Sequence, residues 1–173
     1  MARNARYHYY VEGAIEKKFV DYLKDKQMIR PGKADVFNAV QDYFNLMHIR
    51  SLPPESIIIL IFDTDRNEPD TIVRNIKFLK KHTNIKEVIC IPQATNFEEE
   101  MIRCTSIQRL REFFDCARDS EFKRKFLEEK HLDYRLKSKH FEFKKLWSVA
   151  PPQKFIDLGI TNMADKIKFH NVL

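Results

Sequence analysis

Short runs of apolar residues alternate along the chain with longer segments in which apolar residues recur every three or four positions. The short runs are rich in β-branched and aromatic residues, which is typical of buried strands, whereas the longer spacing is typical of amphipathic helices. The runs predict strands over 6–11, 57–62 and 87–92. The segments between and after them predict helices over 14–26, 34–49, 69–81 and 97–104, the last with Asn96 as its N-cap.

This order predicts the fold class. Strands that alternate with helices imply an α/β fold with a mostly parallel central sheet flanked by helices. A chain of 173 residues suits one domain. We therefore expect an α/β core over 1–105 and a basic, mainly helical extension over 106–173 that packs on the same domain. Residues 141–149 fit a strand or a helix equally well, and 151–173 predict a short helix and a tail.

Composition excludes several classes of protein. The longest apolar run, 57–62, is far shorter than the ~20 residues of a membrane-spanning helix, and no apolar segment follows the N-terminus as in a signal peptide. The three cysteines form no C-x-x-C pair, which favours reduced thiols. Three glycines are too few for a glycine-rich phosphate loop. We expect a cytoplasmic protein that makes no contact with membranes.

Carboxylates follow each predicted strand. Glu12 ends the first strand, Asp63 and Asp65 follow the second, and three glutamates, 98–100, come shortly after the third. Because the carboxyl ends of parallel strands meet at one edge of a sheet, these acids are expected to share that edge. The two aspartates are two positions apart, so an extended chain points both the same way. Glu16 lies in the first turn of the next helix, where the helix dipole favours negative charge.

Such a concentration of carboxylates indicates a cation site. Carboxylates repel one another when they are brought close, so gathering them is costly unless a cation is present. Their oxygens are hard ligands that suit Mg²⁺ or Mn²⁺. No pair of histidines has the spacing of a zinc motif such as H-E-x-x-H. The sequence therefore predicts a divalent metal site built from carboxylates.

Charge is distributed unevenly along the chain. The formal net charge is +6; residues 1–100 hold 15 basic and 15 acidic residues, and the last 73 hold 16 and 10. The densest stretch, 122–145, mixes basic with aromatic residues, a combination that can track a phosphate backbone and stack on bases. A solvated helix surface with its aromatic residues turned inward explains the same pattern. The candidates for nucleic-acid binding are Lys123, Arg124, Lys125, Arg135, Lys137 and Lys139.

Three segments resemble a known family. The first motif of the Toprim domain, a strand ending in Glu-Gly before a helix, resembles YYVEGAIEKKFVDYL. Its second motif, Asp-x-Asp after an apolar strand, resembles IILIFDTDRNE. The Asn-Pro-x-Phe-Glu segment of RloB-like and OLD-type Toprim proteins is similar to IPQATNFEEEMIRC. The resemblance covers 6–104, and it implies a compact Rossmann-like domain that binds a divalent metal for phosphodiester chemistry.

The resemblance implies roles for individual residues at the matching positions. Glu12 would be a metal ligand or a general base, and Asp63 and Asp65 would be the metal-binding Asp-x-Asp. Glu16 matches a second acid of the RloB-like and OLD-type branch. Glu98 matches the acid that follows the aromatic residue of the third segment. All five acids are thus expected to bind Mg²⁺ or Mn²⁺.

These features together predict a Mg²⁺-dependent nuclease that cleaves phosphodiester bonds in DNA or RNA. A role in defence against phage or foreign nucleic acid follows from the branch it resembles. The expected catalytic residues are Glu12, Asp63, Asp65 and Arg66, although Arg66 can equally pair with Glu68. No ATPase motif is present, so a separate ATPase is the expected protein partner. Monomer and homo-oligomer both stay open.

Three alternatives stay open. A phosphatase of the haloacid-dehalogenase type also places Asp-x-Asp after an apolar strand, and it would use Asp63 as its nucleophile. A non-catalytic Toprim-like subunit would keep the domain for interaction or regulation within a defence complex. A ribonuclease resembling the one that matures 5S ribosomal RNA would share the metal site and differ only in its substrate.

Overall fold

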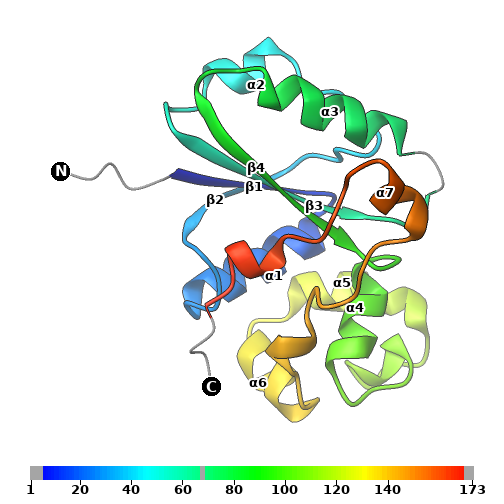
Figure 1. Ribbon diagram of the computed structural model, residues 1–173. Helices are drawn as coiled ribbons and strands as arrows, with labels where there is room; N and C mark the ends of the chain where they lie inside the picture. Colours follow the sequence, from blue (N-terminus) through cyan, green and yellow to red (C-terminus); the bar gives the residue numbers. More distant parts are fainter. Residues whose placement is uncertain (1–5, 67–68, 170–173) are drawn as a thin grey trace.

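A four-stranded parallel sheet is the centre of the fold (Figure 1). The structure, a computed structural model, describes residues 6–66 and 69–169. The strands lie in the order β2-β1-β3-β4, and every neighbouring pair is parallel. Their bounds are β1 (Arg6–Val11), β2 (Gly32–Val36), β3 (Ser56–Asp63) and β4 (Ile85–Gln93). The predicted α/β class with a parallel central sheet is confirmed.

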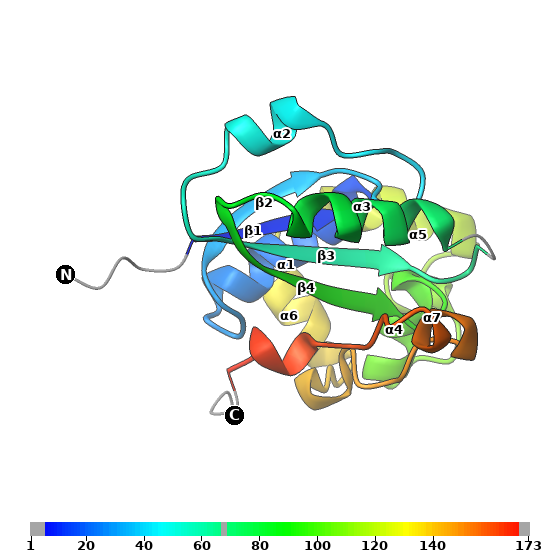
Figure 2. The ribbon, with the colours of Figure 1, turned by 45° about the horizontal axis from the view of Figure 1, so that its top comes forward.

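Helices cover both faces of this sheet (Figure 1, Figure 2). One face carries α1 (Ala14–Asp25), α4 (Phe97–Cys104), α5 (Phe122–Glu128) and α6 (Leu132–Ser138). The other face carries α2 (Leu46–Arg50), α3 (Asp70–Lys80) and α7 (Gln153–Asp157). Short 3₁₀ turns lie at Leu110–Glu112, Asp119–Glu121, Phe143–Lys145 and Ala164–Lys166. Within the described residues, no helix has the length and apolar character needed to cross a membrane.

The residues of β3 alternate between two apolar layers, so this strand is buried on both faces. Ile59 and Ile61 belong to the core on the side of α1, whereas Ile58 and Leu60 belong to the core on the side of α3. Each fully buried aliphatic side chain contributes about 1.5–3 kcal/mol. A shift of the strand by one residue would move each of its side chains to the opposite face of the sheet. The apolar pattern therefore fixes the register of β3, and with it the position of its last residue.

The helix predicted over 34–49 is wrong. Residues Gly32–Val36 form the edge strand β2, which pairs in parallel with β1. The side chain of Asn38 then accepts hydrogen bonds from the backbone N–H groups two and three residues on, both at 3.1 Å, and turns the chain. Within the range 34–49, only the residues that belong to α2 are helical, and Asn45 caps this helix. The apolar residues do recur at helical intervals, but the free edge of β1 offers this backbone a ladder of hydrogen bonds.

Residues beyond 105 contribute to the same core. Four of their phenylalanines pack in one cluster with aromatic residues of α1 and α4; they are Phe113, Phe114, Phe122 and Phe126. Residues 141–149, which fit a strand or a helix from sequence, form neither, since their only regular structure is the 3₁₀ turn at Phe143–Lys145. The short helix predicted after residue 151 is α7.

Candidate active site

Two acids meet at the carboxyl edge of the sheet because β1 and β3 are neighbours. Glu12 directly follows β1, and Asp63 is the last residue of β3. The backbone N–H of Asp63 donates a hydrogen bond to Glu12 Oε1 at 3.2 Å. This bond is possible because the in-register pairing of the two strands brings their ends to the same level. The predicted meeting of these two acids at one edge is what the structure shows.

Glu16 joins the two acids from the first turn of α1. Its side chain is 93% buried, as only 7% is exposed, and within the described residues its Oε2 has no hydrogen-bond partner. Burial raises the pKa of Glu16, and the nearby Glu98 raises it further. A Cβ added at Gly13 would lie 2.9 Å from Glu16 Oε2. The φ of Gly13, −147°, is open to any residue, so a side chain here would act by displacing the carboxylate of Glu16.

The carboxyl group of Asp63 is the most perturbed of the set. Burial, followed by the charges of Glu12 and Glu16, raises the pKa of Asp63 to about 8. Burial also raises the pKa of Glu12, and the charges of Glu16 and Asp65 add to this effect. Such mutual repulsion is the expected result of gathering acids in a partly buried place without a counter-charge.

The loops that follow β3 and β4 are tied together. The hydroxyl of Thr64 donates to the carbonyl of Gln93 at 2.7 Å and accepts from the N–H of Thr95 at 3.2 Å. The N–H of Asp65 donates to the carbonyl of Thr95 at 3.1 Å. Thr95 has a φ of +78°, which lets its carbonyl turn back toward β3. Asp65 is exposed at the outer side of this tie, while Asp63 is half-buried on its inner side.

Glu98 reaches the acids from the first turn of α4. Asn96 caps this helix, as predicted, by accepting a hydrogen bond from the N–H of Glu99 at 3.0 Å. Glu98 Oε1 lies 2.9 Å from Nζ of Lys123, which belongs to α5. The hydrogen bond to Glu98 raises the pKa of Lys123, and the charges of Glu16 and Asp63 add to this. Lys123 therefore lies within the electrostatic reach of Glu16 and Asp63 as well as of Glu98.

The two other glutamates of the same run have different surroundings. Glu99 is exposed. Glu100 is fully buried; its Oε1 lies 2.7 Å from Nη1 of Arg103, and its Oε2 accepts the backbone N–H of Trp147 at 3.2 Å. Glu100 thus holds the distant segment that carries Trp147 against α4. Of the three glutamates, Glu98 is the one that faces the other acids, as the resemblance implied.

Sequence reasoning missed two residues that hold Asp63 in place. Gln93, the last residue of β4, is 1% exposed, and its Nε2 donates to Asp63 Oδ1 at 2.7 Å. Its Oε1 accepts the indole N–H of Trp147 at 3.4 Å. Because the indole is a donor only, it fixes the amide with its NH₂ group toward Asp63. An amide at the end of an apolar strand is a weak signal in the sequence, and nothing there links it to Trp147.

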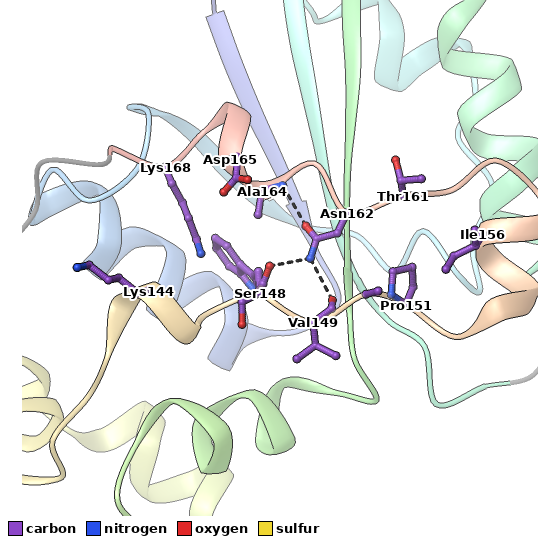
Figure 3. A pocket seen from close by; sticks show the side chains of 12 residues that line it. Lys144, Ser148, Val149, Pro151, Ile156, Thr161, Asn162, Ala164, Asp165 and Lys168 are labelled. Carbon is purple, nitrogen blue, oxygen red and sulfur yellow. Dashed lines mark hydrogen bonds between the residues drawn. The ribbon is translucent and has the colours of Figure 1, made fainter.

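A hollow lies behind Trp147, between residues 147–151 and 161–168 (Figure 3). Asn162 bridges its two walls. The amide nitrogen of Asn162 donates to the carbonyls of Trp147 at 2.7 Å and Val149 at 3.3 Å, and its oxygen accepts from the N–H of Ala164 at 3.0 Å. These bonds support the backbone at Trp147, where φ is +52°. Asn162 therefore helps to hold the segment whose indole contacts Gln93.

The predicted basic residues take different positions. Arg66 is exposed, and its Nη1 and Nη2 lie 2.5 and 2.9 Å from the side-chain amide of Gln41, which accepts from both when its oxygen faces the guanidinium. The alternative partner of Arg66, Glu68, lies outside the described residues. Of the six residues proposed for nucleic-acid binding, Lys123 contacts an acid of the site. The other five lie on α5 and α6 or at the end of α6.

The donor set fits a hard divalent cation. Every donor is a carboxylate oxygen, and the buried Oε2 of Glu16 has no other partner within the described residues. Lys123 supplies the only positive charge that contacts these acids among residues 6–66 and 69–169. Over the same residues, no three Asp, Glu, His or Cys side chains already stand in an arrangement that could hold a metal ion. The acids therefore share an edge, but their side chains would have to move before they could bind one ion together.

Comparison of the chain with models of known families, with curated proteins and with solved structures returned no match. The chemistry of the side chains described above is therefore what bears on function.

Proposed function

We propose that this chain is a cytoplasmic Mg²⁺- or Mn²⁺-dependent nuclease that hydrolyses phosphodiester bonds in DNA or RNA. The observation that carries the proposal is the convergence of Glu12, Glu16 and Asp63 at the carboxyl edge of the sheet, with the pKa of Asp63 raised to about 8. Asp65 and Glu98 flank them. These five acids would hold the metal, which when bound activates water and neutralises the charge of the phosphate.

The other residues of the site have separate roles in this proposal. Gln93 and Trp147 orient the carboxylate of Asp63 and favour its ionised form. Lys123 and Arg66 are cations near the acids, and they would bind the non-bridging oxygens of the phosphate. The buried position of Glu16 keeps one carboxylate oxygen free of hydrogen bonds from any residue that the structure describes. In this proposal the acids come from the carboxyl ends of β1 and β3 and from the first turns of α1 and α4, while Gln93 ends β4 and Lys123 belongs to α5.

The resemblance of three segments to Toprim motifs supports the same proposal. The acids it names stand at the edge of a four-stranded parallel sheet. A role in defence and a separate ATPase partner come from the resemblance alone, and they belong to the proposal on that ground.

A cleavage assay with a matched pair of variants tests this function. Wild-type protein, Asp63→Asn and Asp25→Asn would be incubated with plasmid, single-stranded DNA and transfer RNA, in Mg²⁺, Mn²⁺ or EDTA. Asp25 is exposed and is the last residue of α1, at the opposite end of this helix from Glu16. The substitution Asp25→Asn therefore removes the same charge as Asp63→Asn, but away from the acids. We expect metal-dependent cleavage that Asp63→Asn lowers about a hundredfold or more, and that Asp25→Asn leaves intact.

The alternatives give other results in the same experiment. A phosphatase would release phosphate from a small phosphomonoester and carry a phosphoryl group on Asp63, without cutting any nucleic acid. A non-catalytic subunit would cut nothing under any of the metal conditions. Cleavage that survives both EDTA and Asp63→Asn would show a contaminating nuclease and contradict the proposal.

A further inference from the structure

The basic side chains of α5 and α6 are largely neutralised by acids of the same region. Five of the six residues predicted to bind nucleic acid form ion pairs with carboxylates. These pairs are Lys123–Glu98 at 2.9 Å, Arg124–Glu128 at 3.0 Å, Arg135–Asp115 at 3.3 Å, Lys137–Asp133 at 3.0 Å and Lys139–Asp115 at 2.9 Å. A phosphate backbone on this surface would have to compete with these acids for each cation.

A second group of cations lies on α3 and at its C-cap, and the acid that comes before them on this helix is Asp70, one turn before Arg74. Arg74, Lys77, Lys80 and Lys81 are all exposed. Across residues 6–66 and 69–169, no carboxylate lies within ion-pair distance of any of the four. Arg74, Lys77 and Lys81 follow one another at intervals of three and four residues, so they share one face of the helix. At 1.5 Å per residue they span about 10 Å along the helix.

An exposed aromatic ring lies beside the first of these cations. Tyr43, in the loop before α2, is 54% exposed. The guanidinium of Arg74 lies 5.6 Å from the centre of its ring, and Nη1 of Arg74 donates to its hydroxyl at 3.3 Å. The next residues also expose apolar surface, since Leu46 is 53% and Met47 is 79% exposed. Bases of a single strand stack on exposed aromatic side chains such as this tyrosine.

This surface is continuous with the edge that carries the acids. Figure 2 shows α3 running back along β3 from the carboxyl edge of the sheet. The loop that carries Tyr43 also carries Gln41, which contacts Arg66 directly after the Asp-x-Asp. A strand bound along α3 would therefore lead toward Glu12 and Asp63.

We propose that the surface formed by Arg74, Lys77 and Lys81 on α3 and at its C-cap, together with the neighbouring Tyr43, binds a single-stranded segment of nucleic acid and leads it to the acids. Its phosphates lie on the three cations, and one base stacks on the tyrosine. The inference rests on the proposed function for its substrate class, and it moves the binding surface from α5 and α6 to the opposite face of the sheet.

Fluorescence anisotropy of a labelled strand tests the surface without any cleavage. Wild-type protein would be titrated in EDTA into fluorescein-labelled oligo(dT) and oligo(U) of about 15 nucleotides. The test variant is Arg74→Gln/Lys77→Gln/Lys81→Gln. The matched control, Arg124→Gln/Lys125→Gln/Lys137→Gln, removes the same three charges from α5 and α6. Thermal melting of both triple variants checks that each is folded.

We expect the α3 variant to weaken binding about tenfold or more, and the control to weaken it less than about threefold. The slope of log Kd against log salt should fall by about 2 in the α3 variant, because three phosphate contacts are lost. Tyr43→Ala should weaken binding several-fold, whereas Tyr43→Phe, which keeps the ring, should bind like wild type.

Equal weakening by the two triple variants would show binding by net charge alone and overturn the proposal, as would a larger effect of the control. Failure of the folded wild-type protein to bind either strand would overturn it as well. The proposed function fails separately. If the α3 variant loses binding while no condition gives cleavage, the surface stands and the nuclease falls; if cleavage requires Asp63 but the α3 variant binds normally, the nuclease stands and the surface falls.

Discussion

Gly13 controls the position of Glu16 through space alone. Its backbone is extended, with a φ of −147°, so alanine fits the conformation without strain. The added Cβ would lie 2.9 Å from Glu16 Oε2, and the carboxylate must move away from it. We expect Gly13→Ala to lower the affinity for Mn²⁺ about tenfold while leaving the melting temperature nearly unchanged. Isothermal titration with Mn²⁺ measures the first effect and thermal melting the second.

Gly159 provides a control for this prediction, because at this position an added Cβ is expected to strain the backbone without touching the site. It has a φ of +79° and no atom within 4 Å of an added Cβ. Gly159→Ala should therefore cost about 1 kcal/mol of stability through backbone strain and leave Mn²⁺ affinity unchanged. If both variants lower metal affinity equally, Glu16 is not a ligand.

The raised pKa of Asp63 predicts how stability depends on pH when no metal is present. The pKa is about 8 in the folded chain against an ordinary value of 3.8. Between these values the folded state holds a proton that the unfolded state has lost, so the free energy of unfolding falls as pH rises from 4 to 8. Glu12 and Glu16, whose pKa values are also raised, act in the same direction.

Urea unfolding of wild-type protein and Asp63→Asn in EDTA, at about pH 5 and pH 8, measures this dependence. The variant should lose less stability than wild type between the two pH values, because its amide does not titrate. Added Mn²⁺ should stabilise wild type more at pH 8 than at pH 5. Parallel losses in the two proteins would mean that Asp63 ionises normally.

At the scale of elements, the sequence predicted best those strands and helices whose own residues carry the apolar pattern that becomes buried. The strand at 57–62 and the helix at 69–81 differ from β3 and α3 by one residue at each end. β2 was missed because its pairing depends on the free edge of β1, which no local pattern reveals. The same holds within the site: Asp63 follows its own strand, whereas Trp147 reaches it through a contact 54 residues away in sequence from Gln93.

Helix α5 is held against the sheet layer by aromatic contacts. The ring of Phe126 lies 5.5 Å from that of Phe97 and 6.4 Å from that of Phe19, centre to centre. Phe126→Ala would leave a cavity in this cluster and should lower the free energy of unfolding by about 3–5 kcal/mol. Leu127→Ala, at a neighbouring position that is 45% exposed, should change it by less than about 0.5 kcal/mol. Urea unfolding of both variants gives the comparison.

At the scale of the whole molecule, the two segments expected from sequence, 1–105 and 106–173, contribute residues to the same hydrophobic clusters. Leu146 and Ile167 are fully buried in the cluster that contains β1 and α1, and Phe155 is fully buried in the cluster on the side of α3. A chain ending at residue 105 would expose the apolar surface that these residues cover. We expect such a chain to lack a cooperative thermal transition by circular dichroism. A sharp transition near that of the full chain would show that the first segment folds alone.

Trp147 has one more consequence, because it is the only tryptophan in the chain. Its indole N–H is separated from the Asp63 carboxylate by a single buried amide, that of Gln93. Tryptophan fluorescence therefore comes from one position in the molecule, and that position adjoins the acids. The emission of the unlabelled protein is a built-in optical probe of the site, against which any ion or phosphate that enters can be titrated directly.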